Sequence, residues 1–360
     1  HPERLAGGGR AASPVVASGM TMRPLRAFTA AGRRVALAAA ALVSLSACAS
    51  RAVPENTVTA CYSGTDATSS AVLYAADHGF FERNGLRVTL LFANGGSAAV
   101  ATLLSGQSQI CQMSGANVVP AAQAGEDLVV VAGIVNTTPF KLIAHPTITR
   151  PEQLVGQTFA SPAGGGSYEL GLRLQLSSIG VRFEQVKFVP LGSQAAVIAA
   201  MQAGAVAAAL QVPPETAELL TQGFVEVPFG AGARPAFQHI GLVTRTSYLQ
   251  ERRPTVLAYV RAVGQAIAAM KGDEPGTSAV IAKYRRLDAV AQKASLALAH
   301  REVVQGIFAS VPRPTLEGME YIISQSPPAP GARRVTAADV VDTSVVDELE
   351  RTGAFAGTAP

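Results

Sequence analysis

The stretch of residues 154–179 constrains the fold most, because it has the pattern of a short strand, a glycine-rich turn and a helix. Residues 158–160 suit a brief buried strand, which Pro162 and the glycines at 164–166 then end. We expect Ser167 to cap the helix by accepting a hydrogen bond from a free backbone N–H. Such a helix start presents unpaired N–H groups and the positive end of the helix dipole, so it can bind an anion.

A second interpretation of this stretch is a longer strand. Leucines at 170, 172, 174 and 176 alternate with other residues, which is the period of a strand. We favour a helix because Leu, Arg, Gln and Glu are good helix formers and no residue from Tyr168 to Ser178 is β-branched. The glycine run matches neither G-x-x-x-x-G-K-[ST] nor G-x-G-x-x-G, so it is an anion-binding turn or an ordinary loop, not a nucleotide signature.

Strands and helices alternate along most of the chain. We predict strands at residues 57–62, 86–92, 109–113, 128–134, 141–144, 157–160, 186–190, 207–212, 224–227 and 237–244. We predict helices at residues 69–78, 98–104, 115–123, 167–179, 194–203, 215–222, 254–270, 275–284, 288–308, 316–324 and 336–351. This alternation implies parallel strand pairing and an α/β fold, in which ligands bind outside the carboxyl ends of the strands.

Composition and charge exclude two broad classes of protein. Of the 360 residues 48% are hydrophobic and 15% charged, so the chain can bury a large core and is not a disordered protein. Six basic residues and one acidic residue lie in residues 1–47, and the rest of the chain is near neutral. A near-neutral body argues against a nucleic-acid partner.

The N-terminal segment has the pattern of an export signal. Arg33 and Arg34 precede an apolar run at 35–47 that is too short to span a bilayer, which takes about 20 residues. The run ends in Leu45-Ser46-Ala47-Cys48, which resembles a bacterial lipobox with Cys48 as the lipidated residue. We therefore expect a lipoprotein that is exported by the general secretion pathway. A plain signal peptide is the alternative to lipidation, and twin-arginine export is the alternative to general secretion.

The boundaries of this segment follow from the lipobox. Residues 1–47 would be the signal peptide with upstream sequence, since Met20 or Met22 is the expected start, and residues 48–54 would be the lipidated tether. Beyond Cys48 two cysteines remain, Cys61 and Cys111, both in strand-like stretches. They can pair in an oxidising compartment, but buried free thiols are the interpretation that we favour.

Four segments are similar to those of one known family. Residues 76–88 resemble its G-F-F-x-x-x-G-L-x-V segment, and residues 103–110 its L-x-x-G-x-x-D-I segment with Gln109 in place of Asp. Residues 148–158 resemble I-x-x-P-x-D-L-x-G-K-x, and residues 203–214 resemble G-x-V-D-A…P with Ala207 in place of Asp. In this order they are typical of periplasmic solute-binding proteins of ABC importers, in particular the aliphatic sulfonate, taurine, nitrate and thiamine-pyrimidine-precursor binders.

The resemblance implies the type II periplasmic-binding-protein fold. This is a two-lobed α/β fold with two crossover strands and the ligand in the cleft between the lobes. The first lobe would comprise residues 55–143 and 240–352, the second residues 144–239, and residues 353–360 would form a C-terminal tail. The protein would be an extracytoplasmic, membrane-anchored monomer that closes on a small solute and delivers it to a membrane permease. In this fold the first and third strands are neighbours, which would allow Cys61 and Cys111 to pair.

The expected ligand-binding residues follow the strands of both lobes at their carboxyl ends. They are Ser63, Asp66, Thr68, Asn94, Gly96, Ser97, Ser114, Gly115, Ala116, Asn136, Thr137, Ser161, Gly166, Ser167, Tyr168, Gln211, Pro213 and Phe237. Helix starts at Ser69, Ser97 and Ser167 would suit a carboxylate or sulfonate. Asp66 would instead favour a cationic or hydrogen-bond-donating solute. A small organic anion is therefore the first expectation, and a thiamine-pyrimidine precursor the second.

Other functional classes find less support in the sequence. Relatives that make the thiamine pyrimidine carry a cysteine cluster, C-C-C-F-C, which this sequence lacks. It also lacks the G-x-S-x-G motif of hydrolases, and its five histidines do not have metal-ligand spacing. We expect no catalytic residues, metal or cofactor, and we expect His145 and His239 to be polar residues near the two crossings. A sensor that signals to a membrane receptor remains an alternative to transport.

Overall fold

The structure is a computed structural model that describes residues 56–230 and 234–355. The predicted signal peptide at 1–47 and the predicted lipidation site Cys48 lie outside these residues. Two five-stranded sheets organise the described chain, and the predicted two-lobed α/β fold is confirmed.

The first sheet has the strand order β2-β1-β3-β10-β4. Its strands are β1 (Thr57–Tyr62), β2 (Arg87–Phe92), β3 (Ile110–Met113), β4 (Leu128–Thr137) and β10 (Ala236–Arg245). β1 is parallel to both β2 and β3, whereas β10 is antiparallel to both β3 and β4. The late strand β10 therefore completes a sheet whose other strands come from the first part of the chain.

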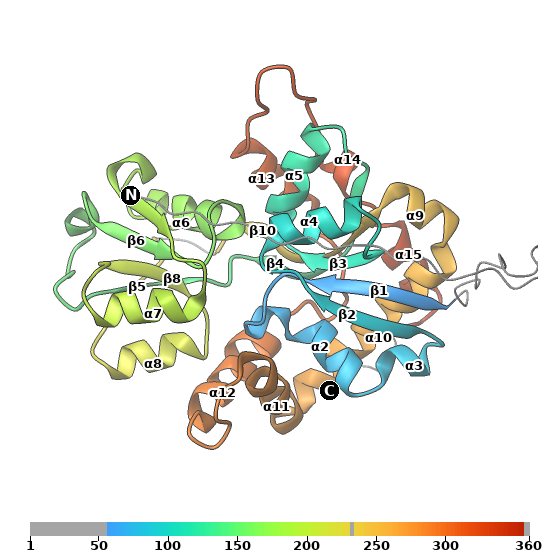
Figure 1. The fold of residues 1–360 in the computed structure, drawn as a ribbon, viewed down its shortest axis with the longest axis horizontal. Helices are drawn as coiled ribbons and strands as arrows, with labels where there is room; N and C mark the ends of the chain where they lie inside the picture. The colour runs from blue at the N-terminus through green and yellow to red at the C-terminus, as the bar shows by residue number, and fades with distance from the viewer. Residues whose placement is uncertain (1–55, 231–233, 356–360) are drawn as a thin grey trace, which may run out of the picture. The chain divides into compact units, whose positions relative to one another are not determined.

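Helices cover both faces of this sheet (Figure 1). One face carries α4 (Gly96–Leu104), α5 (Gly115–Gln123), α13 (Leu316–Ser324) and α14 (Ala337–Val340). The other carries α2 (Ser70–Asp77), α3 (Phe80–Arg83), α10 (Arg253–Gly272) and α15 (Ser344–Arg351). Successive side chains of a strand point to opposite faces of the sheet. Cys61 of β1 therefore packs against the helices of the first face, and its neighbour Ala60 packs against those of the other face.

The remaining helices of this lobe continue the tail or form short turns. They are η2 (Ala67–Ser69), α9 (Thr246–Glu251), α11 (Glu274–Arg285), α12 (Lys293–Ala299) and the π-helical turn η5 (His300–Gln305).

The second sheet has the order β7-β6-β8-β5-β9. Its strands are β5 (Lys141–Ala144), β6 (Thr158–Ser161), β7 (Lys187–Pro190), β8 (Ala208–Gln211) and β9 (Val225–Val227). Its helices are η3 (Pro151–Leu154), α6 (Gly166–Ser178), η4 (Phe183–Gln185), α7 (Gln194–Gln202) and α8 (Glu215–Thr221). Leu172 and Leu176 of α6 pack on one face of the sheet, and Met201 of α7 and Leu219 of α8 pack on the other.

The chain crosses between the sheets twice. It leaves the first sheet after Thr137, and β5 already belongs to the second sheet, so the crossing precedes the expected boundary at residue 143. The return strand β10 begins at Ala236, a few residues before the expected boundary at 239. The strand predicted at 141–144 thus lies inside the second lobe because it pairs with β8 and β9.

Residues 154–179 fold as a short strand, a glycine turn and a helix, and the alternative of a longer strand is wrong. The predicted cap is also wrong, since Ser167 lies inside the first turn and Gly165 is the N-cap, without a side-chain cap bond. Gly165 and Gly166 have φ angles of 70° and 62°, in the left-handed region that favours glycine. These two glycines turn the chain into the helix before Ser167 is reached.

The tail departs from the prediction at two places. The predicted helix at 288–308 begins only at Lys293, and α12 passes directly into the π-helical turn η5, so the helix is confirmed except for its first five residues. The capping box of Thr336 and Asp339 is confirmed, but α14 ends at Val340. The reason is that Val341 forms a bridge with Val130 of β4 and the Asp342 N–H donates to the Val130 carbonyl at 3.0 Å.

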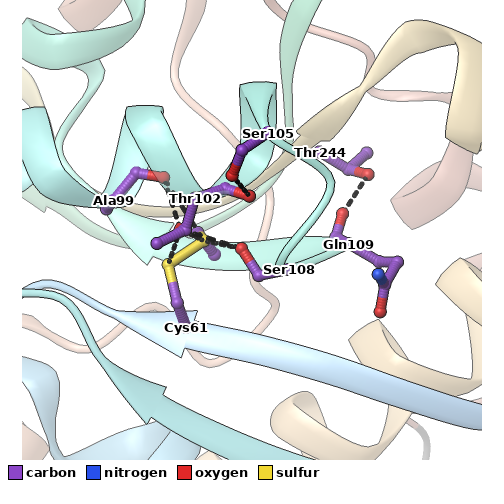
Figure 2. The surroundings of a disulfide bond; sticks show 8 residues. Cys61, Ala99, Thr102, Ser105, Ser108, Gln109 and Thr244 are labelled. Carbon is purple, nitrogen blue, oxygen red and sulfur yellow. Dashed lines mark hydrogen bonds between the residues drawn. A yellow bond between two sulfur atoms is a disulfide. The ribbon is translucent and has the colours of Figure 1, made fainter.

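Cys61 and Cys111 form a disulfide, so the favoured interpretation as free thiols is wrong. The two residues are register partners on the parallel strands β1 and β3, with Cα atoms 4.3 Å apart and both side chains fully buried. Figure 2 shows the hydroxyl groups of Thr102 and Ser108 beside the sulfurs, and Ser108 Oγ lies 3.0 Å from Cys111 Sγ. The disulfide closes a loop with a sequence separation of 50 that includes β2 and α4.

We predict that this disulfide stabilises the first lobe by restricting the unfolded chain. The Cys61→Ala/Cys111→Ala variant should lose about 2–4 kcal/mol of unfolding free energy in urea denaturation. Dithiothreitol should lower the stability of the wild type and leave that of the variant unchanged. Detection of both thiols as free in unfolded, unreduced protein would contradict the pairing.

Candidate functional site

A cavity of about 650 Å³ lies where the carboxyl ends of strands from both sheets face each other. The first lobe contributes the loops after β1, β2 and β3, and the second contributes the loops after β6 and β7. Nine of the residues predicted to bind a ligand line this cavity. They are Ser63, Asp66, Asn94, Gly96, Ser97, Ser114, Gly166, Ser167 and Tyr168.

The other nine predicted residues do not line the cavity, and several of them bond elsewhere. These residues are Thr68, Gly115, Ala116, Asn136, Thr137, Ser161, Gln211, Pro213 and Phe237. The Asn136 side-chain amide donates to the Arg313 carbonyl at 2.7 Å, and the Thr137 hydroxyl donates to the Pro235 carbonyl at 3.2 Å. Phe237 is fully buried in the core of the first lobe.

Helices of both lobes begin at the cavity wall. α4 and α5 begin there in the first lobe, and α6 and α7 in the second. The α5 start is capped by Ser114, whose Oγ accepts from the Ala116 N–H at 3.2 Å. The α7 start is capped in the same way by Ser193, whose Oγ accepts from the Ala196 N–H. A helix start carries unpaired N–H groups and the positive end of the helix dipole, so these starts can offer hydrogen-bond donors at the cavity wall.

The start of α7 was not among the predicted binding residues. Gly192, Ser193 and Gln194 line the cavity directly after β7. The signal was present, because Gly192-Ser193 separates a predicted strand at 186–190 from a predicted helix at 194–203.

A buried ion pair crosses the cavity wall. The guanidinium of Arg285, at the end of α11, donates to the carboxylate of Glu215, at the start of α8. Glu215 is only 4% exposed, and its burial raises the pKa of this carboxyl while Arg285 opposes the shift. Glu215 Oε2 and Arg285 Nε have no hydrogen-bond partner within the described chain. The sequence carried no signal for Arg285, which lies in the helical tail far from the strand ends.

Asp66 and His239 line the cavity and both contact Thr68, which is buried behind the wall. Asp66 accepts from the Thr68 N–H at 2.9 Å and from the Thr68 hydroxyl, and Thr68 Oγ1 lies 3.4 Å from His239 Nε2. Burial lowers the pKa of His239 to about 4, with Asp66 acting in the opposite direction, so this imidazole is neutral at pH 7. Its Nδ1 has no partner among the described residues. His145, the other histidine expected near a crossing, instead bonds to Thr147 on the surface.

Two aromatic rings border the cavity. Tyr168 packs against Phe140 with ring centroids 4.8 Å apart. Burial, and then the charges of Asp66 and Glu215, raise the pKa of the Tyr168 phenol, so it remains a neutral hydrogen-bond donor. Phe92 lies at the end of β2 and is 52% exposed.

Asn117 of α5 lies between two of the helix starts. A Cβ atom at Gly96 would lie 1.9 Å from Asn117 Oδ1, and one at Gly166 would lie 3.3 Å from Asn117 Nδ2. Both α4 and α6 therefore approach α5 through a glycine. Gly96 belongs to the first lobe and Gly166 to the second, so the approach of α6 to α5 is a contact between the lobes.

Other candidate groups are engaged away from the cavity. Lys141 pairs with Glu302 at 2.9 Å, and Arg173 pairs with Glu169 and Glu184, so neither cation lines the wall. Residues 56–230 and 234–355 contain no group of three or more His, Cys, Asp or Glu side chains placed to hold a metal ion. No helix in the described ranges is both long and apolar enough to span a bilayer.

Known structures share this fold at low sequence identity. The alkanesulfonate-binding protein SsuA from Xanthomonas axonopodis pv. citri, solved with MOPS, has a TM-score of 0.65 at 18% identity over 80% of this chain and 98% of its own. The periplasmic aliphatic sulphonate binding protein SsuA from Escherichia coli has a TM-score of 0.57 at 21% identity, covering 68% of this chain and 83% of its own. The periplasmic nitrate-binding protein NrtA from Synechocystis PCC 6803 has a TM-score of 0.64 at 11% identity, covering 85% and 91%.

Sequence comparison places the chain in a family. A search of curated proteins finds no match. The model of the NMT1/THI5-like family matches residues 67–275, which include strands of both sheets and most of the cavity wall. This match spans more than half of the chain, so the protein belongs to the NMT1/THI5-like family and has the type II periplasmic-binding-protein fold.

Proposed function

We propose that this protein is an extracytoplasmic receptor that binds a small organic solute in the cavity and delivers it to an ABC permease. One observation supports the proposal above the others. A cavity of about 650 Å³, of the size that suits a small molecule, is lined by loops and helix starts of both lobes. A solute that touches both lobes favours their closure, which is how such a receptor would signal its loaded state to the permease.

A carboxylate or sulfonate is the first candidate for the group that the solute presents. Helix starts of both lobes lie at the cavity wall, and backbone N–H groups at a helix start bind anions without a cationic side chain. Arg285 is already neutralised by Glu215. The acid group of a solute would therefore be held by the N–H groups of these helices and by side chains such as Ser97 and Ser167.

A thiamine-pyrimidine precursor is the second candidate. Asp66, Glu215 and Glu218 bring three carboxylates to the cavity wall, against one guanidinium. The unpartnered Oε2 of Glu215 could accept a hydrogen bond from the amino group of a pyrimidine, and Tyr168 offers an aromatic face. Membership of the NMT1/THI5-like family adds weight to this class.

Three further expectations remain predictions. We expect no catalytic role, because the Thr68 hydroxyl that lies 3.4 Å from His239 Nε2 is fully buried and does not line the cavity. We favour transport over signalling to a receptor because structures of the same fold include the ligand-binding component of an ABC-type import system from Staphylococcus aureus. A monomer is the expected state of the receptor.

The first test is a thermal-shift screen against small sulfonates, carboxylates, nitrate and pyrimidines. A solute at 100 times its Kd should add about 2.7 kcal/mol of stability. Gly166→Ala should then weaken binding of that solute at least tenfold, because the added methyl meets Asn117 of the other lobe.

Gly180→Ala is the matched control for this variant. Gly180 has a φ angle of 78° and nothing within 4 Å of an added Cβ, so it shares the backbone strain without the interlobe contact. Equal losses of affinity in the two variants would contradict a role for close approach of α5 and α6. The absence of a shift with every solute would count against a receptor for these classes.

We predict that His239 makes the fold sensitive to acid. Its pKa is about 4 in the folded protein against an ordinary value of 6.5, so below pH 6.5 the unfolded state takes up a proton that the folded state does not. The stability is complete above pH 6.5 and is lost as the pH falls towards 4. Between pH 7 and 4.5 the wild type should lose about 2 kcal/mol more unfolding free energy than His239→Gln. Parallel pH profiles of the two proteins in urea denaturation would exclude this assignment.

We predict that Cys48 anchors the protein to the membrane through an attached lipid. Cys48→Ser in the full chain should move the protein from the detergent phase to the aqueous phase in Triton X-114 partition. Cys61→Ala/Cys111→Ala is the control, because it removes cysteines that form an internal disulfide. Partition of the wild type into the aqueous phase would disprove lipidation.

A further inference from the structure

Two ion pairs join the second lobe to the helical tail of the first. The carboxylate of Glu215 in α8 pairs with Arg285 at the end of α11. Lys141, the first residue of β5, pairs with Glu302 in the π-helical turn η5 at 2.9 Å. Helices α8 and α12 are also in contact, so the tail meets the second lobe at several neighbouring points.

Arg285 is held in place by the local backbone. It is followed by Arg286, which has a φ angle of 56° and caps α11 in the left-handed conformation. This conformation is uncommon for a residue other than glycine, and it turns the chain so that Leu287 also lines the cavity. Arg285 is only 15% exposed at the side chain, so its pair with Glu215 is shielded from solvent.

Lys141 connects the tail to both crossings. It lies just after the first crossing, and its ammonium group is also 3.5 Å from Glu226 of β9, just before the second crossing. The pairs of Arg173 and Arg253, by contrast, stay within a lobe. Arg173 pairs with Glu169 and Glu184 in the second lobe, and Arg253 pairs with Glu348 in the first.

We propose that Arg285–Glu215 and Lys141–Glu302 form an interlobe latch that holds the lobes in the arrangement seen here. Removal of one partner of the buried pair leaves the other charge buried and unpaired, which penalises the latched arrangement more than removal of both. Opening of the lobes returns the unpaired charge to water. The single variants should therefore open the protein, and neutralisation of both groups together should restore much of the closure.

The test is small-angle X-ray scattering of Arg285→Gln, Glu215→Gln and the double variant. Each protein is unfolded and refolded beforehand to remove any copurified solute, and circular dichroism verifies its refolding. Both single variants should show a larger radius of gyration than the wild type, and the double variant a value between theirs and that of the wild type. Glu302→Gln, which breaks the more exposed pair, should open the lobes less and supplies a second variant if a change at Arg285 impairs folding.

Arg173→Gln is the matched control, because it removes a guanidinium whose partners lie in the same lobe. Its radius of gyration should equal that of the wild type. The latch is refuted if Arg285→Gln and Glu302→Gln both keep the wild-type radius, or if the double variant opens as far as the sum of the single changes. No solute is added in this experiment, so a negative result would leave the proposed binding function standing.

Discussion

The position of β10 is the constraint on which the rest of the structure depends. This strand returns from the second lobe and inserts antiparallel between β3 and β4, with the interior of the strand fully buried. β10 has ten residues and pairs with a strand on each side, so a shift of its register would break the backbone hydrogen bonds to both β3 and β4. This register fixes where the chain crosses between the lobes. It also carries His239 to the cavity, where burial keeps the imidazole neutral beside Asp66.

The cavity combines two kinds of electrostatic contribution. Helix starts from both lobes supply partial positive charge through the backbone, whereas Asp66, Glu215 and Glu218 supply negative side chains. The single guanidinium, that of Arg285, is committed to Glu215. The wall can therefore meet an acid group with N–H donors and an amino group with carboxylates, and glycines at 96 and 166 let the helix starts approach Asn117 closely.

Much of the fold could be predicted from the sequence because its signals are local. The strand and helix alternation, the glycine turn before α6 and the capping box of Thr336 each depend on residues close together in the chain. Half of the expected binding residues line the cavity for the same reason, since a polar turn after a strand marks the carboxyl edge of a sheet. Asn136 does not line the cavity although β4 ends at the same edge, because its side chain bonds to the Arg313 carbonyl in the tail.

The sequence by itself determined the α/β class, the order of most elements and the carboxyl edges at which a ligand would bind. Only the tertiary structure decided which distant groups meet there. The register of β1 and β3 places Cys61 beside Cys111, and the path of the tail brings Arg285 to Glu215, 70 residues away in sequence. Local propensity specifies the conformation of a segment, whereas these contacts depend on how separate segments pack, and no local pattern of residues encodes that packing.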